Sequence, residues 1–169
     1  MYSKIISQDS LSNVVTLAEA KRQCRVMHDF DDDFIQSLIP VSAELAQSYS
    51  ERALTPAVVT AVYESYTSQV LLPYGEASAI TELLVDGSAS TNYDLDDITQ
   101  KLTVGDSYSK LKVTYECGYT TIPTHIKHAI LLTISTLYNN REDFVTGVTV
   151  ATLPMTACKV IDAVKYYGI

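Results

Sequence analysis

The chain has 169 residues, 47% of them apolar, and a formal net charge of −8. This length and composition favour one folded domain with a sizeable core over global disorder. The negative charge argues against a protein that binds a DNA duplex, because that task needs a basic face, although a local basic patch stays open.

Neither a membrane span nor a signal peptide is expected. No apolar run approaches the roughly 18 residues that a span requires, and residues 1–10 lack an apolar core. Three cysteines, Cys24, Cys117 and Cys158, are far apart and form no C-x-x-C pair. We therefore expect reduced, mostly buried thiols in a cytosolic protein.

The N-terminal part is predicted to be an extended arm over residues 1–15, followed by a short helix. Thr16-Leu17-Ala18-Glu19 matches a capping box, in which the Thr and Glu side chains satisfy each other's backbone N–H groups. The helix should end near Val26. Its inward residues are expected to be Leu17, Ala20, Cys24 and Met27.

An acidic segment follows this helix. Asp29, Asp31 and Asp33 have the spacing that begins a calcium loop. The remainder does not match, because Phe34 stands where the turn glycine belongs and Pro40 where the bidentate glutamate belongs. We expect no metal here, and instead expect Asp31 or Asp32 to cap the next helix.

The second predicted helix runs from Asp32 to about Arg52. Pro40 lies in its interior and should kink the helix or split it in two. The predicted inward face consists of Phe34, Leu38, Val41, Leu45 and Tyr49, widened by Ile35, Ile39, Ala43 and Ala46.

From Thr55 the apolar period changes to two, which is typical of strands. The dipeptide Asp86-Gly87 predicts a hairpin turn. In the last strand, the inward residues should be Leu111, Val113, Tyr115 and Cys117. Strands are predicted at 58–64, 69–73, 80–85, 93–95, 101–104 and 111–117.

A long helix over Ile122–Phe144 is expected to be the central helix of the fold. Residues 145–152 could form a loose strand or an exposed arm, and residues 155–167 indicate a final helix. The predicted inward face of the central helix consists of Ile126, Ala129, Ile130, Thr133, Ile134, Leu137 and Tyr138.

The order of elements predicts an α+β fold. Its mainly helical core would have two N-terminal helices, the long central helix and a short C-terminal helix, with a block of short antiparallel strands and hairpins between. We expect one domain over residues 1–169, with an extended N-terminal arm at 1–15 and a C-terminal arm and helix at 145–169.

The sequence contains few candidates for catalytic or metal-binding residues. His125 and His128 could share a helix face as metal ligands, but no third ligand is evident. Asp96-Asp97 indicates a turn, and the common phosphate-loop and nucleophile motifs do not occur. We therefore expect no cofactor, no metal and no enzymatic activity.

Several segments, taken in order, resemble the head–tail connector family of long-tailed bacteriophages, also called adaptor or head-completion proteins. Pro40 departs from the family pattern, in which the second helix usually continues uninterrupted. The similarity extends over about residues 14–167. The segments that carry it are 16–21, 25–26, 50–54, 72–73, 80–87, 113–119, 122–123, 126–132 and 137–142.

This resemblance implies a structural virion protein at the head–tail interface, present in the host cytoplasm during assembly. Such proteins form a ring under the portal after DNA packaging, match its twelvefold symmetry, extend the DNA channel and present a surface to stopper or tail-completion proteins. DNA would pass through without specific binding. A stopper or tail-completion protein is the nearest alternative, and a soluble protein-binding module is another.

The resemblance also implies where partners would bind. The family's C-terminal segment often reaches toward the portal. We expect the portal contacts to be Pro154, Ile161, Val164, Tyr166 and Tyr167. Independently of the resemblance, residue types suggest a ring-interface or partner face at Lys21, Arg22, Arg25 and Arg141, although residues such as Lys21, Arg22 and Arg25 more often form a solvated helix face.

Overall fold

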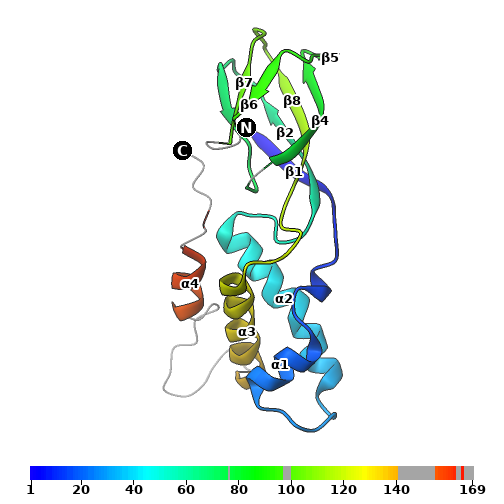
Figure 1. The fold of residues 1–169 in the computed structure, drawn as a ribbon, viewed down its shortest axis with the longest axis vertical. Coiled ribbons are helices and arrows are strands. Elements are labelled where there is room, and N and C mark those ends of the chain that lie inside the picture. Colours follow the sequence, from blue (N-terminus) through cyan, green and yellow to red (C-terminus); the bar gives the residue numbers. More distant parts are fainter. Residues whose placement is uncertain (76, 97–99, 141–154, 163–164, 166–169) are drawn as a thin grey trace. The chain divides into compact units, whose positions relative to one another are not determined.

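The computed structural model describes residues 1–75, 77–96, 100–140, 155–162 and 165. They form four α-helices, a short 3-10 helix and two antiparallel sheets, so the predicted α+β class is confirmed (Figure 1). The chain forms two compact units. The β unit comprises Met1–Asp9 and Glu51–Thr120, and the helical unit comprises Ser10–Ser50 and Thr121–Lys165. No helix in the described ranges is long and apolar enough to cross a membrane.

The β unit contains a five-stranded and a three-stranded sheet. The larger has the order β1-β2-β8-β4-β5, and the smaller has the order β3-β7-β6. Every pairing within them is antiparallel. The strands are β1 (Tyr2–Gln8), β2 (Ala57–Tyr63), β3 (Gln69–Leu71), β4 (Ala77–Val85), β5 (Ser88–Ala89), β6 (Tyr93–Leu95), β7 (Lys101–Val104) and β8 (Leu111–Cys117).

Strand β8 lies in the middle of the larger sheet, and its alternation follows the prediction. The side chains of Leu111, Val113, Tyr115 and Cys117 are buried. On the opposite face, the Thr114 hydroxyl is 3.1 Å from the hydroxyl of Thr60 on β2. Apolar residues at every second position therefore place one face of β8 in the core.

Two glycines set the ends of these strands. Asp86 and Gly87 have φ angles of 48° and 87°, as the turn between β4 and β5 requires. Gly118 ends β8 with φ 98°, and a Cβ at this position would lie 2.1 Å from the carbonyl oxygen of Thr55. Only glycine fits both the backbone angle and the contact.

Residues 1–9, predicted as part of an extended arm, belong to the β unit. Strand β1 pairs along β2 from Tyr2 to Gln8, with a bulge at Ile6. A 3-10 helix, η1 (Leu11–Asn13), follows, and the next two residues, Val14 and Val15, are buried. Within segment 1–15, β1 is thus extended, as expected, and is also part of a sheet, whereas the residues from Ser10 onward belong to the helical unit.

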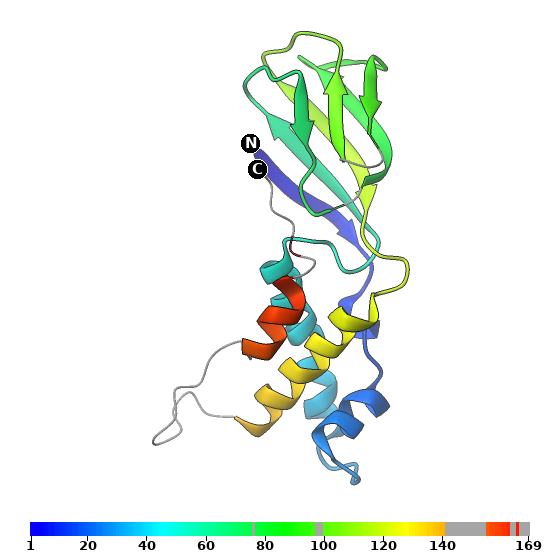
Figure 2. The same ribbon diagram turned by 60° about the vertical axis from the view of Figure 1, so that its left-hand side comes forward.

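The helical unit consists of α1 (Leu17–Cys24), α2 (Asp32–Ser50), α3 (Thr124–Asn139) and α4 (Met155–Asp162). Helix α3 packs against the other three and is the central helix, as predicted (Figure 2). It is shorter than predicted, and Pro123 is its N-cap. Its buried residues are Ile126, Ala129, Ile130, Thr133 and Ile134.

Helix α2 differs from the prediction in two ways. It continues through Pro40 as one helix of 19 residues, so the proposed split is wrong. The residues predicted to widen its inward face are buried, but the predicted centre of that face is not, and Val41, expected inside, is 46% exposed. Small side chains on the buried face allow neighbouring helices to approach closely. That face consists of Ile35, Ile39, Ser42, Ala43, Ala46 and Ser50.

Candidate interaction surfaces

The connection between α1 and α2 begins where Arg25 ends α1. Arg25 has φ 59°, a left-handed conformation, and its N–H donates to the carbonyls of Arg22 and Lys21. Because the helix stops there, Met27 does not continue the helical face. Its side chain is 99% exposed, so its predicted inward orientation is wrong.

Lys21 holds this connection in place. Its Nζ atom lies 2.6 Å from an oxygen of Asp29 and 2.6 Å from an oxygen of Asp32, while the Lys21 side chain is only 16% exposed. Both hydrogen bonds raise the pKa of Lys21, and the bond to Asp29 has the larger effect. The expected partner contact at Lys21 is therefore occupied by the chain itself.

The aspartates bind protein groups. The hydroxyl of Tyr138, on α3, donates to an oxygen of Asp31 at 2.6 Å. The hydrogen bond from Lys21 lowers the pKa of Asp29. In the described ranges, no group of three or more His, Cys, Asp or Glu residues could hold a metal ion. Asp29 and Asp31 thus serve to position the loop.

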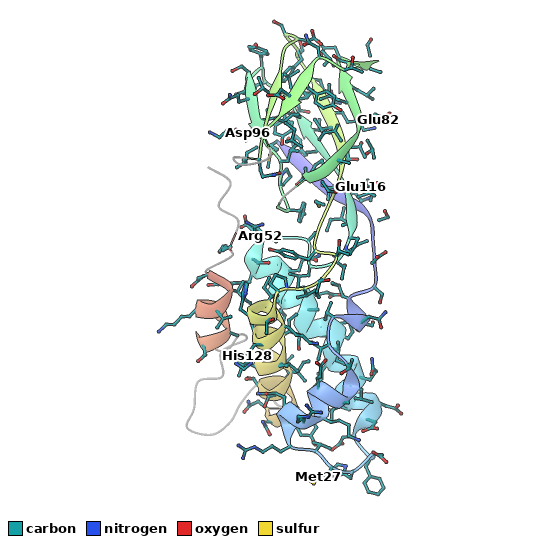
Figure 3. The ribbon with its side chains drawn as sticks, viewed as in Figure 1. Met27, Arg52, Glu82, Asp96, Glu116 and His128 are labelled. Carbon is teal, nitrogen blue, oxygen red and sulfur yellow. The ribbon has the colours of Figure 1, made fainter. Side chains whose placement is uncertain are left out.

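Two large apolar side chains project from this loop. Met27 and Phe30 are 99% and 95% exposed, and we call this pair the apolar tip. Met27 lies beyond the ends of the helices in Figure 3. The imidazole of His28 lies 5.6 Å from the Phe30 ring, centroid to centroid. Neither residue was predicted to be exposed, although apolar residues among aspartates between two helices were a usable signal.

Two of the other predicted basic residues lie at the end of α1. Arg22 and Arg25 are exposed on and just after α1, and Arg141 lies outside the described residues. Of the sequence-predicted face at Lys21, Arg22, Arg25 and Arg141, the residues Arg22 and Arg25 are thus at the surface, and Lys21 binds aspartates of the loop.

The predicted portal contacts lie at α4 and around it. Ile161 is fully buried, so its side chain holds α4 in the helical unit and has no surface for a partner. The Tyr49 hydroxyl donates to Asp162 at 2.7 Å, a bond that raises the pKa of Tyr49 to about 12. Lys165 Nζ lies 4.6 Å from the centre of the Tyr49 ring. Pro154, Val164, Tyr166, Tyr167 and the proposed arm at 145–152 lie outside the described residues.

A pocket in the β unit is too small for a substrate. Its volume is about 30 Å³, which is room for one water molecule. His125 and His128, which the sequence analysis set aside as a metal pair, are both exposed on α3. The pocket is lined by Arg52, Ala53, Tyr74, Gly75, Gly118 and Tyr119.

The cysteines are free thiols, but only Cys117 is buried, whereas Cys24 and Cys158 are partly exposed, so the expectation of mostly buried thiols is wrong. Burial raises the pKa of Cys117 to about 11 and also raises the pKa of Cys24. Cys117 is therefore protonated at neutral pH, which leaves little of the thiolate that nucleophilic chemistry needs.

Comparison with known families identifies the class of protein. The model described as phage gp6-like head-tail connector protein matches residues 14–104, more than half of the chain. The chain belongs to this family, which confirms the resemblance drawn from the sequence. No curated protein sequence matches it significantly.

Solved structures share the fold over the whole chain. A chain in the neck of an empty GTA particle, computed with C6 symmetry, is 13% identical with a TM-score of 0.77. A chain in the neck of a native GTA particle, computed with C12 symmetry, is 12% identical with a TM-score of 0.75. A chain of the native gene transfer agent virion is 12% identical with a TM-score of 0.74. Each alignment covers 100% of this chain and 97% of the other.

Proposed function

We propose that this protein is a structural head–tail connector in the neck of the virion. Copies form a ring below the portal after DNA packaging, extend the DNA channel and present a docking surface to a stopper or tail-completion protein. The observation that carries the proposal is membership of the connector family together with a fold shared, end to end, with chains of GTA necks.

The surfaces on the described residues suit assembly. The pocket of the β unit is water-sized, while the exposed apolar residues Met27 and Phe30 are of the types enriched in protein interfaces. A ring requires two different patches on each subunit, so that one copy's first patch meets its neighbour's second.

Charge distribution supports a channel that DNA does not bind. Met1–Asp9 and Glu51–Thr120 carry eleven acidic and five basic residues, a net −6 of the chain's −8. An acidic channel wall would release few counterions from DNA and would let it slide. Titration of DNA against the assembled ring at low salt tests this, and we expect no tight binding. Tight binding would contradict a non-adhesive channel.

The decisive experiment mixes the purified protein with the portal ring of its particle and measures the complex mass by sedimentation. We expect a saturating shift of one copy per portal subunit, twelve per ring. The absence of a shift, with both components folded, would contradict the connector assignment and favour the stopper or tail-completion alternative.

The proposed C-terminal docking is tested by substitution rather than deletion. Because Ile161 is buried, removing the chain from residue 153 would also disrupt the helical unit. We expect the double variant Tyr166→Ser with Tyr167→Ser to bind the portal at least about tenfold more weakly. The exposed Tyr66→Ser serves as the control. Unchanged portal affinity of the double variant would remove these two tyrosines from the interface.

A further inference from the structure

Strand β1 leaves one edge of the larger sheet open. No other described strand pairs with its outer side, and the bulge at Ile6 leaves Tyr2–Ile5 as a regular stretch. Open edges are usually short or interrupted by proline and charge, whereas β1 has seven residues, no proline and one charged side chain, Lys4. Tyr2 and Ile6 are 67% and 59% exposed. The edge therefore has the features of a site for strand addition.

Strand β6 leaves an edge of the smaller sheet open. Within the described residues it pairs only with β7. The carbonyl of Asn92 accepts from the residue that follows β7, and the N–H of Asp96 donates to Lys101 of β7. Because the direction of these groups alternates along a strand, the N–H and C=O groups of Tyr93 and Leu95 point to the outer side.

The two open edges lie on opposite sides of the β unit. Tyr63 of β2, the neighbour of β1, donates to the carbonyl of Leu71 on β3, so β3 lies at the β1 side. Strand β6 is at the other end of its sheet and follows β5 after three residues. A subunit with two different edges on opposite sides can meet one copy at each edge, as a ring requires.

The side chains along the two edges alternate in the same way. On β1, Ile5 packs against the core, so the neighbouring Lys4 points to the opposite face. On β6, Tyr93 and Leu95 pack against the same core, so Asp94 points away from it. Lys4 and Asp94 are both exposed, and neither side chain has a hydrogen-bond or ion-pair partner in the described structure.

This alternation makes the two edges complementary to each other. In an antiparallel pairing with Lys4 opposite Asp94, opposite charges meet on the outer face. Ile5 then lies opposite Tyr93 on the core side, which is a favourable pair of a β-branched and an aromatic residue. The segment that fits the open edge of β1 is therefore present in a second copy of the chain.

We propose that β1 of one copy adds as an antiparallel strand to β6 of the next copy in the ring, with Lys4 opposite Asp94. This inference rests on the proposed ring and deepens it, since it names the two edges that meet. The ion pair sets the register of the strands, while backbone hydrogen bonds and the covering of Tyr2 and Ile6 supply affinity. The net charge of −8 still opposes association, because one ion pair per interface leaves most of that charge unpaired.

Disulfide crosslinking on the portal ring tests the pairing directly. The variants Lys4→Cys and Asp94→Cys are loaded as an equimolar mixture and oxidised, and the wild type with its three native cysteines gives the background. We expect a covalent dimer with one copy of each variant, because directly opposite residues of paired strands are close enough for a disulfide. Neither variant should form this dimer alone. Crosslinks of Lys4→Cys with itself, or none in the mixture, would overturn the proposal.

Charge reversal separates the ion pair from the net charge. Asp94→Lys adds two positive charges, so the net charge of −8 becomes −6 and the general repulsion between copies falls. We nevertheless expect its half-saturating concentration on the portal ring to rise at least about threefold, because Lys4 then faces a second lysine. The matched control Glu64→Lys, at an exposed residue of the β unit, should load at least as well as the wild type. Combining Lys4→Asp with Asp94→Lys should restore wild-type loading.

The outcomes distinguish this inference from the proposed function. If the wild type loads onto the portal ring but Asp94→Lys loads like Glu64→Lys, the two edges are not the interface and the connector assignment stands. If the wild type does not load at all, both proposals fail. Thermal melting checks that every variant is folded.

Discussion

At the scale of single residues, Glu19 serves two elements at once. Its Oε2 atom accepts from the Thr16 N–H at 3.0 Å, which closes the capping box of α1. Its Oε1 atom accepts from Lys127 of α3 at 2.7 Å. The hydrogen bond from Lys127 is the main reason why the pKa of Glu19 falls to about 2.

This shift predicts a pH-dependent contribution to stability. At pH 7 we expect Lys127→Met to lower the free energy of unfolding by about 1 kcal/mol, since the pair is one-third exposed and screened by solvent. A depressed folded-state pKa gives stability above the unfolded pKa of about 4.5, which is lost as pH falls towards 2. The difference between variant and wild type should therefore shrink between pH 5 and pH 2. Urea unfolding at several pH values measures it, and a constant difference would contradict this interpretation.

Gly118 gives a second prediction at this scale. We expect Gly118→Ala to cost at least about 3 kcal/mol, because the new methyl group meets the Thr55 carbonyl in addition to the strain of a positive φ. The matched control is Gly87→Ala, which has φ 87° but open space around it, and should cost only about 1 kcal/mol. Denaturant midpoints compare the two, and equal losses would mean that the Thr55 contact has no effect.

At the scale of elements, strands were easier to predict than helix faces. The bounds of β6, β7 and β8 match the prediction. A period of two also leaves no ambiguity about which residues of a strand face inward. Helix α2 is apolar on a broad stripe, so the sequence placed Ala43 and Ala46 inside correctly but could not show that Val41, on the same stripe, would be exposed.

The interaction surfaces were less predictable. The capping box at Thr16 was readable from four neighbouring residues. The bonds Lys21–Asp32 and Tyr138–Asp31 depend on the tertiary arrangement, so the exposure of Phe30 and the loss of Lys21 as a surface charge could not be derived from spacing. Residue types suggested the basic face, but only packing decides which charges reach the surface.

The continuity of α2 through Pro40 leads to a prediction for that helix. Proline lacks the N–H that would bond to the carbonyl four residues earlier, so tertiary packing sustains the helix at this point. We expect Pro40→Ala to raise the free energy of unfolding by about 1–3 kcal/mol. The measurement is the urea midpoint, with Val41→Ala as a neighbouring control. A lower midpoint for Pro40→Ala would mean that the proline ring makes contacts worth more than the missing bond.

At the scale of the whole molecule, the charge of −8 opposes self-association. Copies brought together in a ring repel one another, and added salt screens that repulsion over a distance of about 10 Å at 0.1 M. We therefore predict that self-association strengthens as salt rises from about 50 to 500 mM. Sedimentation velocity at fixed protein concentration measures it. Weakening by salt would instead indicate that opposite charges dominate the interface between copies.

The division into two units also affects the order in which parts of the protein fold during synthesis. Helices α1 and α2 leave the ribosome roughly 70 residues before α3, a delay of about 4–15 s at bacterial rates. The strands from β1 to β8 are complete before α3 appears. We expect the β unit to fold first during synthesis. Until α3 is made, the apolar face of α2 stays exposed to solvent. Slow translation between α2 and α3 would thus expose the nascent chain to chaperones and proteases at its helical part.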